Sequence, residues 1–234
     1  SQRVNPRQRQ RYRRKLAASV QSEGYAMYPG ERFNTYSHLS GLVLAAAGLV
    51  MMLLKAEEYG DGYRTFSVSV YGISLFLLYL SSSLYHGIKA GRLKSILKKV
   101  DHCMIYVLIA GSYTPFALVS LRNGPGWTVF LLSWLLAVAG ISQELTLGRK
   151  SEKRLLSIVI YVVMGWMVLA EMKTLTASLP AAGLVWLAAG GILYSIGIYW
   201  FVNDKKIRHG HGIWHLFVLG GSITQFISVY GYVI

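Results

Sequence analysis

The sequence predicts an all-α membrane protein that folds as a bundle of seven transmembrane helices. The chain of 234 residues is 53% hydrophobic and only 15% charged, whereas about a quarter of the residues in a soluble domain are charged. Its mean hydropathy is +0.40. Seven apolar runs approach the length of about 20 residues that a helix needs to cross a hydrocarbon core of about 30 Å. The single cysteine, Cys103, excludes an intramolecular disulfide framework.

The apolar runs are separated by residues that end helices. The runs are residues 38–54, 66–86, 102–121, 127–141, 156–174, 181–202 and 212–233, of which the fourth is the shortest. Gly60, Gly62, Gly124 and Pro180 lie in the connections, where glycine and proline are expected. We therefore predict one membrane domain, residues 31–234, preceded by a basic cytoplasmic arm over residues 1–30.

The distribution of lysine and arginine predicts the orientation of the bundle, because cytoplasmic loops are enriched in these residues. Of the 24 basic residues, 20 lie before the first helix or in the connections after the second, fourth and sixth helices. Only Lys55, Arg64, Arg122 and Lys173 lie on the other side. The N-terminus is therefore expected in the cytoplasm and the C-terminus outside.

The orientation, the last helix and the position of the basic residues argue against several classes of protein and of binding partner. A G-protein-coupled receptor has the reverse topology, so no G protein is expected. A retinal protein needs a lysine in its last helix, and residues 212–234 contain none. The net charge of +14 would fit nucleic-acid binding. We expect no nucleic acid, however, and assign the arm to anionic lipid headgroups, to which each basic residue contributes about 1 kcal/mol.

Polar side chains from separate parts of the sequence are expected at one depth, near the inner leaflet. His86 ends the second helix, and Ser82 lies one turn before it. Asp101 lies at the start of the third helix, and His211 and His215 lie at the start of the seventh. Ionisable groups inside a membrane are costly, so this convergence is a candidate functional site.

The spacing of the histidines is typical of a metal site. His211 and His215 are related as i and i+4, so they share one helix face about 6 Å apart, and both could bind one ion. With His86 they would make three nitrogen ligands and an open fourth position, as in catalytic zinc sites. Asp101 could hydrogen-bond a water molecule on the metal. The alternative at this point is a group of solvated histidines at the membrane interface.

The other histidines receive different interpretations. His209 is assigned to a loop, and His38 to a hydrogen bond at the start of the first helix. His102 lies about 100° around the helix from Asp101, so Asp101 is the residue assigned to the pocket. Cys103 is assigned to packing.

Short motifs extend this pattern along the chain. They are Glu31-x-x-Asn34-x-x-Ser37-His38, Ser82-x-x-x-His86, Asp101, Gly111-Ser112-Tyr113-Thr114-Pro115 and His211-x-x-x-His215. Together they resemble the bacterial hemolysin III proteins, the prokaryotic branch of the progestin and adiponectin receptor (PAQR) family, over roughly residues 31–234. The resemblance implies a Zn²⁺ ion held by His86, His211 and His215. It also implies that Asp101 contacts a water molecule on the zinc and that Ser82 belongs to the site.

The resemblance implies two classes of function in a bacterial inner membrane. Receptors of the family look like part of a superfamily of membrane hydrolases that includes alkaline ceramidases, which implies a zinc-dependent amidase or esterase of acyl lipids. In such an enzyme the zinc activates water, Asp101 is the base and Ser82 assists the oxyanion. The alternative is a zinc-stabilised lipid sensor, or a regulator of membrane composition or energetics, without turnover. A haemolytic pore is disfavoured, because the charged residues gather in loops.

The orientation can be tested by cysteine labelling in intact cells, after Cys103 is replaced. We expect Ile234→Cys to react with a membrane-impermeant reagent added outside, and Lys94→Cys to react only after the cells are opened. Labelling of Lys94→Cys from outside would contradict the predicted orientation.

Overall fold

A computed structural model describes residues 30–147 and 154–234, and these residues form helices and short connections without strands. Seven of the helices are long and apolar enough to cross a membrane, so the predicted seven-helix membrane fold is confirmed. Residues 1–29 and 148–153 lie outside the described part. The first of these segments is nearly all of the predicted basic arm. The second contains Arg149, Lys150 and Lys153, three of the basic residues counted for the orientation. The orientation of the termini stays a prediction.

The helices follow one another along the chain with short connections. The α-helices are α2 Glu31–Glu58, α3 Gly62–Gly87, α4 Arg92–Pro115, α5 Gly126–Thr146, α6 Leu155–Trp166, α7 Met172–Ser178, α8 Ala181–Val202 and α9 Gly210–Ser228. Three short segments extend them: the π-helical η1 Phe116–Ser120 after α4, the 3-10 helix η3 Met167–Glu171 between α6 and α7, and the π-helical η4 Val229–Val233 after α9.

Several helices are longer than the apolar runs that predict them. The first helix begins at Glu31 rather than at residue 38, and the third begins at Arg92 rather than at residue 102. The added turns of α4 contain lysine, arginine and leucine, which favour helix even where the chain leaves the apolar layer. As a result Asp101 and His102 lie inside α4, in its third turn, and not at its start.

Two of the spanning helices contain an irregular turn, one at the end of its span and one inside it. Pro115 lies inside α4 and is followed by the π-helical turn η1, because proline removes a backbone donor from the helix ladder. The second irregular turn, where α6 becomes the 3-10 helix η3, is bonded to Tyr113. The Tyr113 hydroxyl donates to the carbonyl of Gly165 at 3.1 Å and accepts from the amide of Val168 at 3.0 Å.

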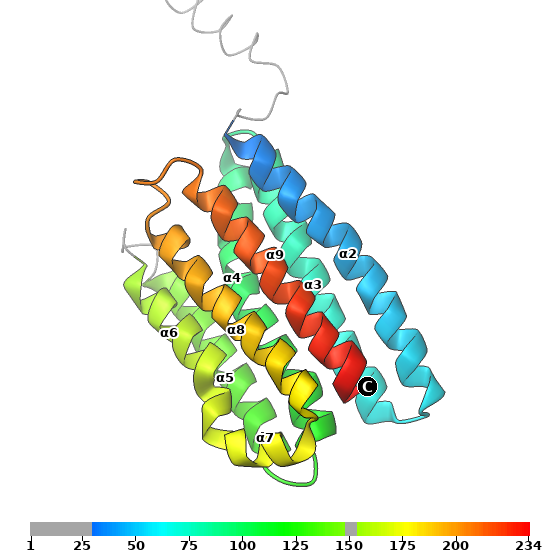
Figure 1. The fold of residues 1–234 in the computed structure, drawn as a ribbon. Helices are drawn as coiled ribbons and strands as arrows, with labels where there is room; N and C mark the ends of the chain where they lie inside the picture. Colours follow the sequence, from blue (N-terminus) through cyan, green and yellow to red (C-terminus); the bar gives the residue numbers. More distant parts are fainter. Residues whose placement is uncertain (1–29, 148–153) are drawn as a thin grey trace, which may run out of the picture.

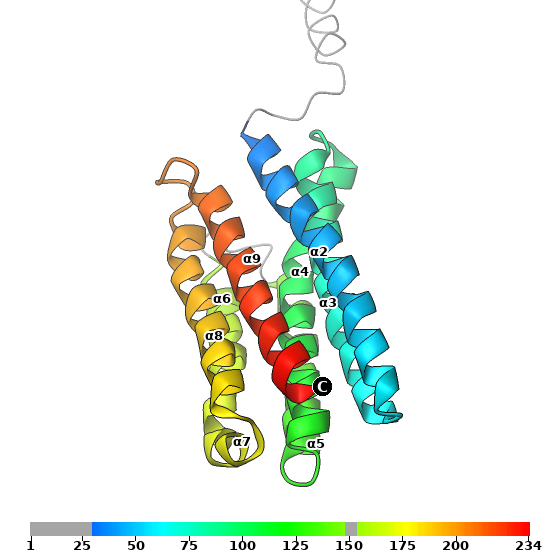
Figure 2. The same ribbon diagram turned by 45° about the vertical axis from the view of Figure 1, so that its right-hand side comes forward.

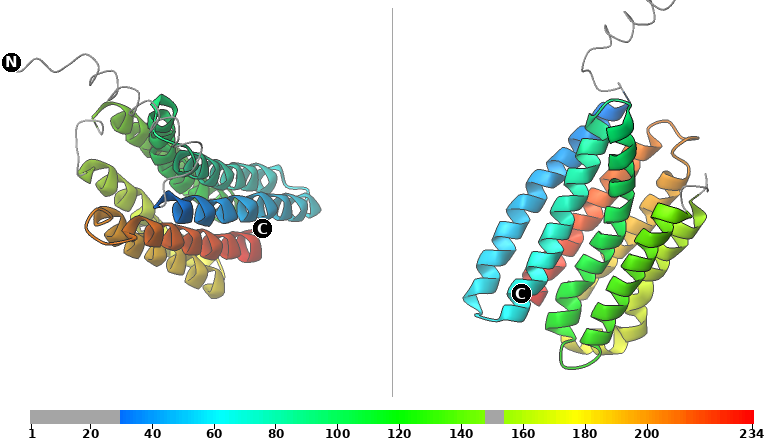
Figure 3. Two further views of the ribbon diagram at one scale, coloured as in Figure 1. Left: turned by 90° about the horizontal axis from the view of Figure 1, so that it is seen from above. Right: turned by 180° about the vertical axis from the view of Figure 1, so that it is seen from behind.

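Neighbouring helices in the sequence pack side by side, and the first and last helices also meet. Helix α2 packs against α3 and α9, and α8 packs along α9 (Figure 1). Seen after a 45° turn, α9 runs between α8 and α2 (Figure 2), and the view from behind shows α3, α4 and α5 in succession (Figure 3). The beginnings of α2, α4 and α9 and the end of α3 lie at one end of the bundle, which we call the histidine end.

Glycines allow the helices to approach closely around large buried tyrosines. A Cβ atom at Gly41 of α2 would lie 2.5 Å from the ring of Tyr79, and one at Gly140 of α5 would lie 2.3 Å from the ring of Tyr106. Both tyrosines are almost completely buried. Small residues opposite large ones are the usual way for membrane helices to gain van der Waals contact.

Another glycine, Gly126, lies against the backbone, and its replacement is expected to lower the stability of the protein. A Cβ atom at Gly126 would lie 2.1 Å from the backbone oxygen of Ala117 and 2.6 Å from that of Leu121, and neither backbone atom can move aside easily. We expect Gly126→Ala to destabilise the protein by about 1–3 kcal/mol, seen as a lower Tm of the purified protein in detergent. The control is Gly165→Ala, where nothing lies within 4 Å of the added atom. Equal Tm values for the two variants would contradict this account of the packing.

Candidate metal centre

Three histidines from two helices converge at the histidine end of the bundle. The ring centroids of His86, at the end of α3, lie 5.0 Å from His211 and 4.9 Å from His215, both in the first turns of α9. The centroids of His211 and His215 are also 4.9 Å apart. One ligand atom from each side chain lies within 4.8 Å of the other two, so the three residues could hold a metal ion.

Each of these imidazoles has a hydrogen-bond acceptor at its Nδ1 atom. His86 Nδ1 bonds to Oε2 of Glu31, and His211 Nδ1 bonds to Oδ2 of Asp204 at 3.1 Å. His215 Nδ1 lies 3.1 Å from the carbonyl oxygen of Asn34. The hydrogen bond from His211 holds the pKa of Asp204, in the connection before α9, below its usual value.

These acceptors determine which nitrogen is free for a metal. A carbonyl or carboxylate oxygen can only accept, so Nδ1 must carry the proton in each neutral imidazole, which leaves the lone pair on Nε2. Among the described residues no protein group bonds to Nε2 of His86, and this atom is buried. Carboxylates or carbonyls behind the histidines are the usual surroundings of bound metal. The donor set therefore fits a zinc ion.

The first turns of α2 supply most of this support. Glu31 also accepts from Nδ2 of Asn34 at 3.2 Å and lies 3.6 Å from Nζ of Lys94. Helix α2 can approach α9 at this point because Gly212 has no side chain. A Cβ atom there would lie 2.6 Å from the ring of Phe33 and 3.2 Å from Oδ1 of Asn34.

Sequence reasoning missed the roles of Glu31 and Asp204. Glu31 is part of a quoted motif, but its contact with His86 joins residues 55 positions apart. Asp204 could have been predicted as a partner of His211, because it lies only seven residues before it, in the connection between α8 and α9.

A small cavity of about 30 Å³ adjoins two of the three histidines, His211 and His215. Ser82 and Asp101 line it together with His211 and His215, so the structure brings together the predicted site residues on α3, α4 and α9. A cavity needs about 10–15 Å³ to hold one water molecule. The space is therefore sufficient for a water molecule or an ion beside Asp101.

Two further histidines lie at this cavity: His38, which makes a hydrogen bond as predicted but not at the start of its helix, and His102, which was predicted to face away. His38 lies two turns inside α2, because the helix begins at Glu31, and its ring stacks on His215 with centroids 3.5 Å apart. Its Nδ1 atom bonds to the Ser82 hydroxyl at 2.7 Å. His102 also lines the cavity, although its Nδ1 lies 3.4 Å from Oε1 of Glu144 on α5. The rotation of 100° between Asp101 and His102 was too small to exclude either residue.

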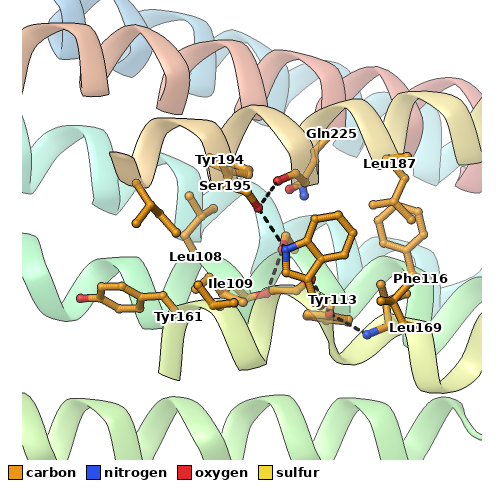
Figure 4. Close-up of a pocket in the computed structure, with 18 of the residues that line it drawn as sticks. Leu108, Ile109, Tyr113, Phe116, Tyr161, Leu169, Leu187, Tyr194, Ser195 and Gln225 are labelled. Carbon is orange, nitrogen blue, oxygen red and sulfur yellow. Dashed lines mark hydrogen bonds between the residues drawn. The ribbon is translucent and has the colours of Figure 1, made fainter. Parts of the chain in front are cut away.

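A much larger apolar cavity of about 490 Å³ continues from the small one along the bundle. Four residues line both cavities: Leu78, Ile105, Trp214 and Val218. The larger cavity runs between α4, α6, α8 and α9 (Figure 4), and its volume is in the range of pockets for small organic ligands. Val162 of α6 and Val185 of α8 line it and are also exposed on the bundle. The cavity is thus within reach of the lipid-facing surface.

The fold and the site together define a polytopic helical membrane protein with a candidate metal centre at one end of its bundle. The chain belongs to the haemolysin-III-related family, whose family model matches residues 27–226, so the predicted family is confirmed.

Individual relatives agree with this assignment. The chain is 40% identical over 201 residues to Hemolysin-3 of Bacillus cereus, which covers 86% of this chain and 90% of that protein. It is 43% identical over 199 residues to the Hemolysin-3 homolog of Bacillus subtilis (strain 168), covering 85% and 92%. The human monocyte to macrophage differentiation factor is 28% identical over 212 residues, covering 85% and 82%.

The metal centre can be tested by metal analysis of the purified protein. We expect about one bound metal ion per chain and a large loss in His215→Ala, because this variant removes one of three nitrogen ligands. The matched control is His209→Asn, since His209 lies outside the cluster with a left-handed φ of 61° that asparagine tolerates. Full metal content in a variant that lacks His86, His211 and His215 would disprove the site.

The hydrogen bond between Glu31 of α2 and His86 can be tested with the variant Glu31→Gln. Loss of the carboxylate behind His86 is expected to lower metal affinity by about 10- to 100-fold, measured by competition with a chelator. Glu57→Gln, an exposed position at the other end of α2, serves as the control and is expected to bind metal like the parent protein.

Proposed function

We propose that this protein binds one zinc ion through His86, His211 and His215 and hydrolyses an amide or ester bond in acyl lipids at the inner leaflet of the cell membrane. The observation on which this proposal rests is that the small cavity beside His211 and His215 shares four lining residues with the much larger apolar cavity. Such an arrangement can hold the polar head of a lipid at the metal and its acyl chain in the cavity.

Zinc is the ion that the ligands favour. Imidazole nitrogen suits zinc, copper, iron and nickel, and three histidines with an open position are the pattern of catalytic zinc sites. Three neutral ligands also leave the ion its full positive charge. When bound, zinc supplies a Lewis acid that lowers the pKa of water and polarises a carbonyl group.

The residues around the small cavity have complementary tasks. Asp101 accepts the proton of the attacking water molecule and then delivers it to the leaving nitrogen or oxygen. His38 positions Ser82. When His38 Nδ1 donates its proton to the Ser82 oxygen, the serine O–H, which is within hydrogen-bond reach of Asp101, can turn to the carbonyl oxygen of the lipid, which becomes negatively charged during attack.

The apolar cavity suits an acyl chain better than a water-soluble substrate. Each CH₂ group transferred from water to an apolar environment contributes about 0.8 kcal/mol, but a lipid in the bilayer has already gained this energy. Binding from the bilayer therefore depends on the head group and on packing within the cavity. The exposed Val162 and Val185, which also line the cavity, favour entry of the chain sideways from the membrane.

A lipid sensor without turnover is the second candidate. The volume of about 30 Å³ beside the histidines favours it, because the space holds a water molecule more readily than a water molecule together with a lipid head group. In a sensor the zinc would join α3 to α9, and an acyl lipid in the larger cavity would change the packing of α9.

Hydrolysis is tested by incubating the zinc-loaded protein with a panel of N-acyl and ester lipids. We expect release of free fatty acid, and we expect Asp101→Asn to lower the rate by about 10²- to 10⁴-fold at equal zinc content, because the amide cannot accept the proton. Asp61→Asn is the control. It makes the same exchange at the N-cap of α3 at the opposite end of the bundle, where asparagine caps equally well.

The outcome separates the two candidates. Release of fatty acid that depends on Asp101 supports the hydrolase. If no fatty acid is released and lipids still raise the Tm of the protein, the hydrolase is rejected and the sensor is favoured.

A further inference from the structure

The apolar cavity contains a polar side chain, Gln225 of α9, whose amide has no hydrogen-bond partner among the described residues. All residues that line this cavity belong to the described part of the chain. Gln225 faces the cavity on the side of Tyr194 and Ser195 (Figure 4). An amide without a partner in an apolar environment is costly. Gln225 is half-buried, so a molecule that enters the cavity can reach this amide and supply its partner.

The other polar groups deep in the cavity are already bonded to the protein. The Trp166 indole donates to the Ser195 hydroxyl at 3.0 Å, and the Tyr113 hydroxyl bonds to the backbone of Gly165 and Val168. The hydroxyl of Tyr194 bonds to Ser222 at 2.9 Å, and that of Ser112 bonds to the carbonyl of Ile109 at 2.8 Å. Trp214 likewise has no partner for its indole N–H within the described part of the chain, but it lies where the large cavity meets the small one, at the histidine end. Gln225 is thus the unbonded donor and acceptor in the deep part.

The position of Gln225 fixes its relation to the metal centre. It lies ten residues after His215 on the same helix, which corresponds to about 15 Å along the axis. Its side chain passes over Gly190 of α8, where a Cβ atom would lie 2.6 Å from Cγ of Gln225. The glycine provides the room that directs this side chain along the helix interface to the cavity.

We infer that the lipid held by this protein has a hydroxyl group on its acyl chain, at the position that reaches Gln225. This inference rests on the proposed binding of an acyl chain in the cavity and adds the chemical class of that chain. A hydroxyl group is both a donor and an acceptor, so it can donate to the amide oxygen of Gln225 or accept from its NH₂ group in the apolar part of the membrane. Gln225 is then a specificity residue, remote from the bond that is cleaved.

The test measures binding of acyl chains to the purified, metal-loaded protein by displacement of a fluorescent fatty acid. The probes are octadecanoic acid and a positional series of its monohydroxy derivatives. We expect one position of the hydroxyl to bind about fivefold tighter than the unsubstituted acid, as one net hydrogen bond provides. Gln225→Met keeps the length and the unbranched shape of the side chain. This variant is expected to lose the preference while it binds octadecanoic acid undiminished.

The control variant is Ser112→Ala, since the Ser112 hydroxyl lines the cavity but is bonded to the carbonyl of Ile109. It is expected to retain the preference. If all probes bind equally to the parent protein, or if Gln225→Met retains the preference, the inference about Gln225 is wrong and acyl binding itself stands. If octadecanoic acid and all of its derivatives fail to bind, acyl binding in the cavity is rejected, and the proposed function fails with it.

Discussion

The hydrogen bonds to the Nδ1 atoms of His86, His211 and His215 are the interaction on which the rest of the site depends. Without Glu31, Asp204 and the carbonyl of Asn34, each imidazole could rotate or change its protonated nitrogen. With them, Nδ1 of each ring is occupied and Nε2 is left for a metal, while one ligand atom from each ring lies within 4.8 Å of the other two. The geometry of the candidate metal centre is therefore fixed from behind, by α2 and by the loop before α9, and not by the histidines alone.

This constraint explains why α2 lies in the groove between α3 and α9. Helix α2 places Glu31 behind His86 and Asn34 behind His215, and it also places His38 against Ser82. Such contacts require the backbones to approach closely. Gly212 opens the space next to Phe33 and Asn34, and Gly41 opens the space next to Tyr79. In a membrane, where lipid is as apolar as the helices, close packing and polar contacts together stabilise such an arrangement.

The sequence predicted the fold and the grouping of the three histidines well, and the surroundings of these histidines poorly. Long apolar runs predict membrane helices because the bilayer requires every backbone group to be bonded within its own helix. The i, i+4 spacing predicts that His211 and His215 share a face for the same local reason. The contact of Glu31 with His86, the stack of His38 on His215 and the outline of the apolar cavity depend on which faces of distant helices meet. The spacing of residues along one helix does not determine which faces of distant helices meet. The starts of α2 and α4 were predicted too late along the chain because their first turns are polar.

The metal centre and the apolar cavity are coupled through the helices that build both. In the absence of an ion, three Nε2 lone pairs would converge without protein partners in a largely buried site, which is unfavourable. A bound ion removes this cost and joins α3 to α9, so its binding energy also stabilises the fold. Leu78 of α3 and Trp214 and Val218 of α9 line both cavities, so a metal and an acyl chain bound as proposed would contact the same helices. By linkage, a ligand that favours one packing of α9 must change the affinity for the metal by the same factor as the metal changes the affinity for the ligand. A hydrolase and a sensor would both depend on this coupling between the binding of the metal and the binding of the lipid. They would differ only in whether the polar end of the lipid reaches Asp101.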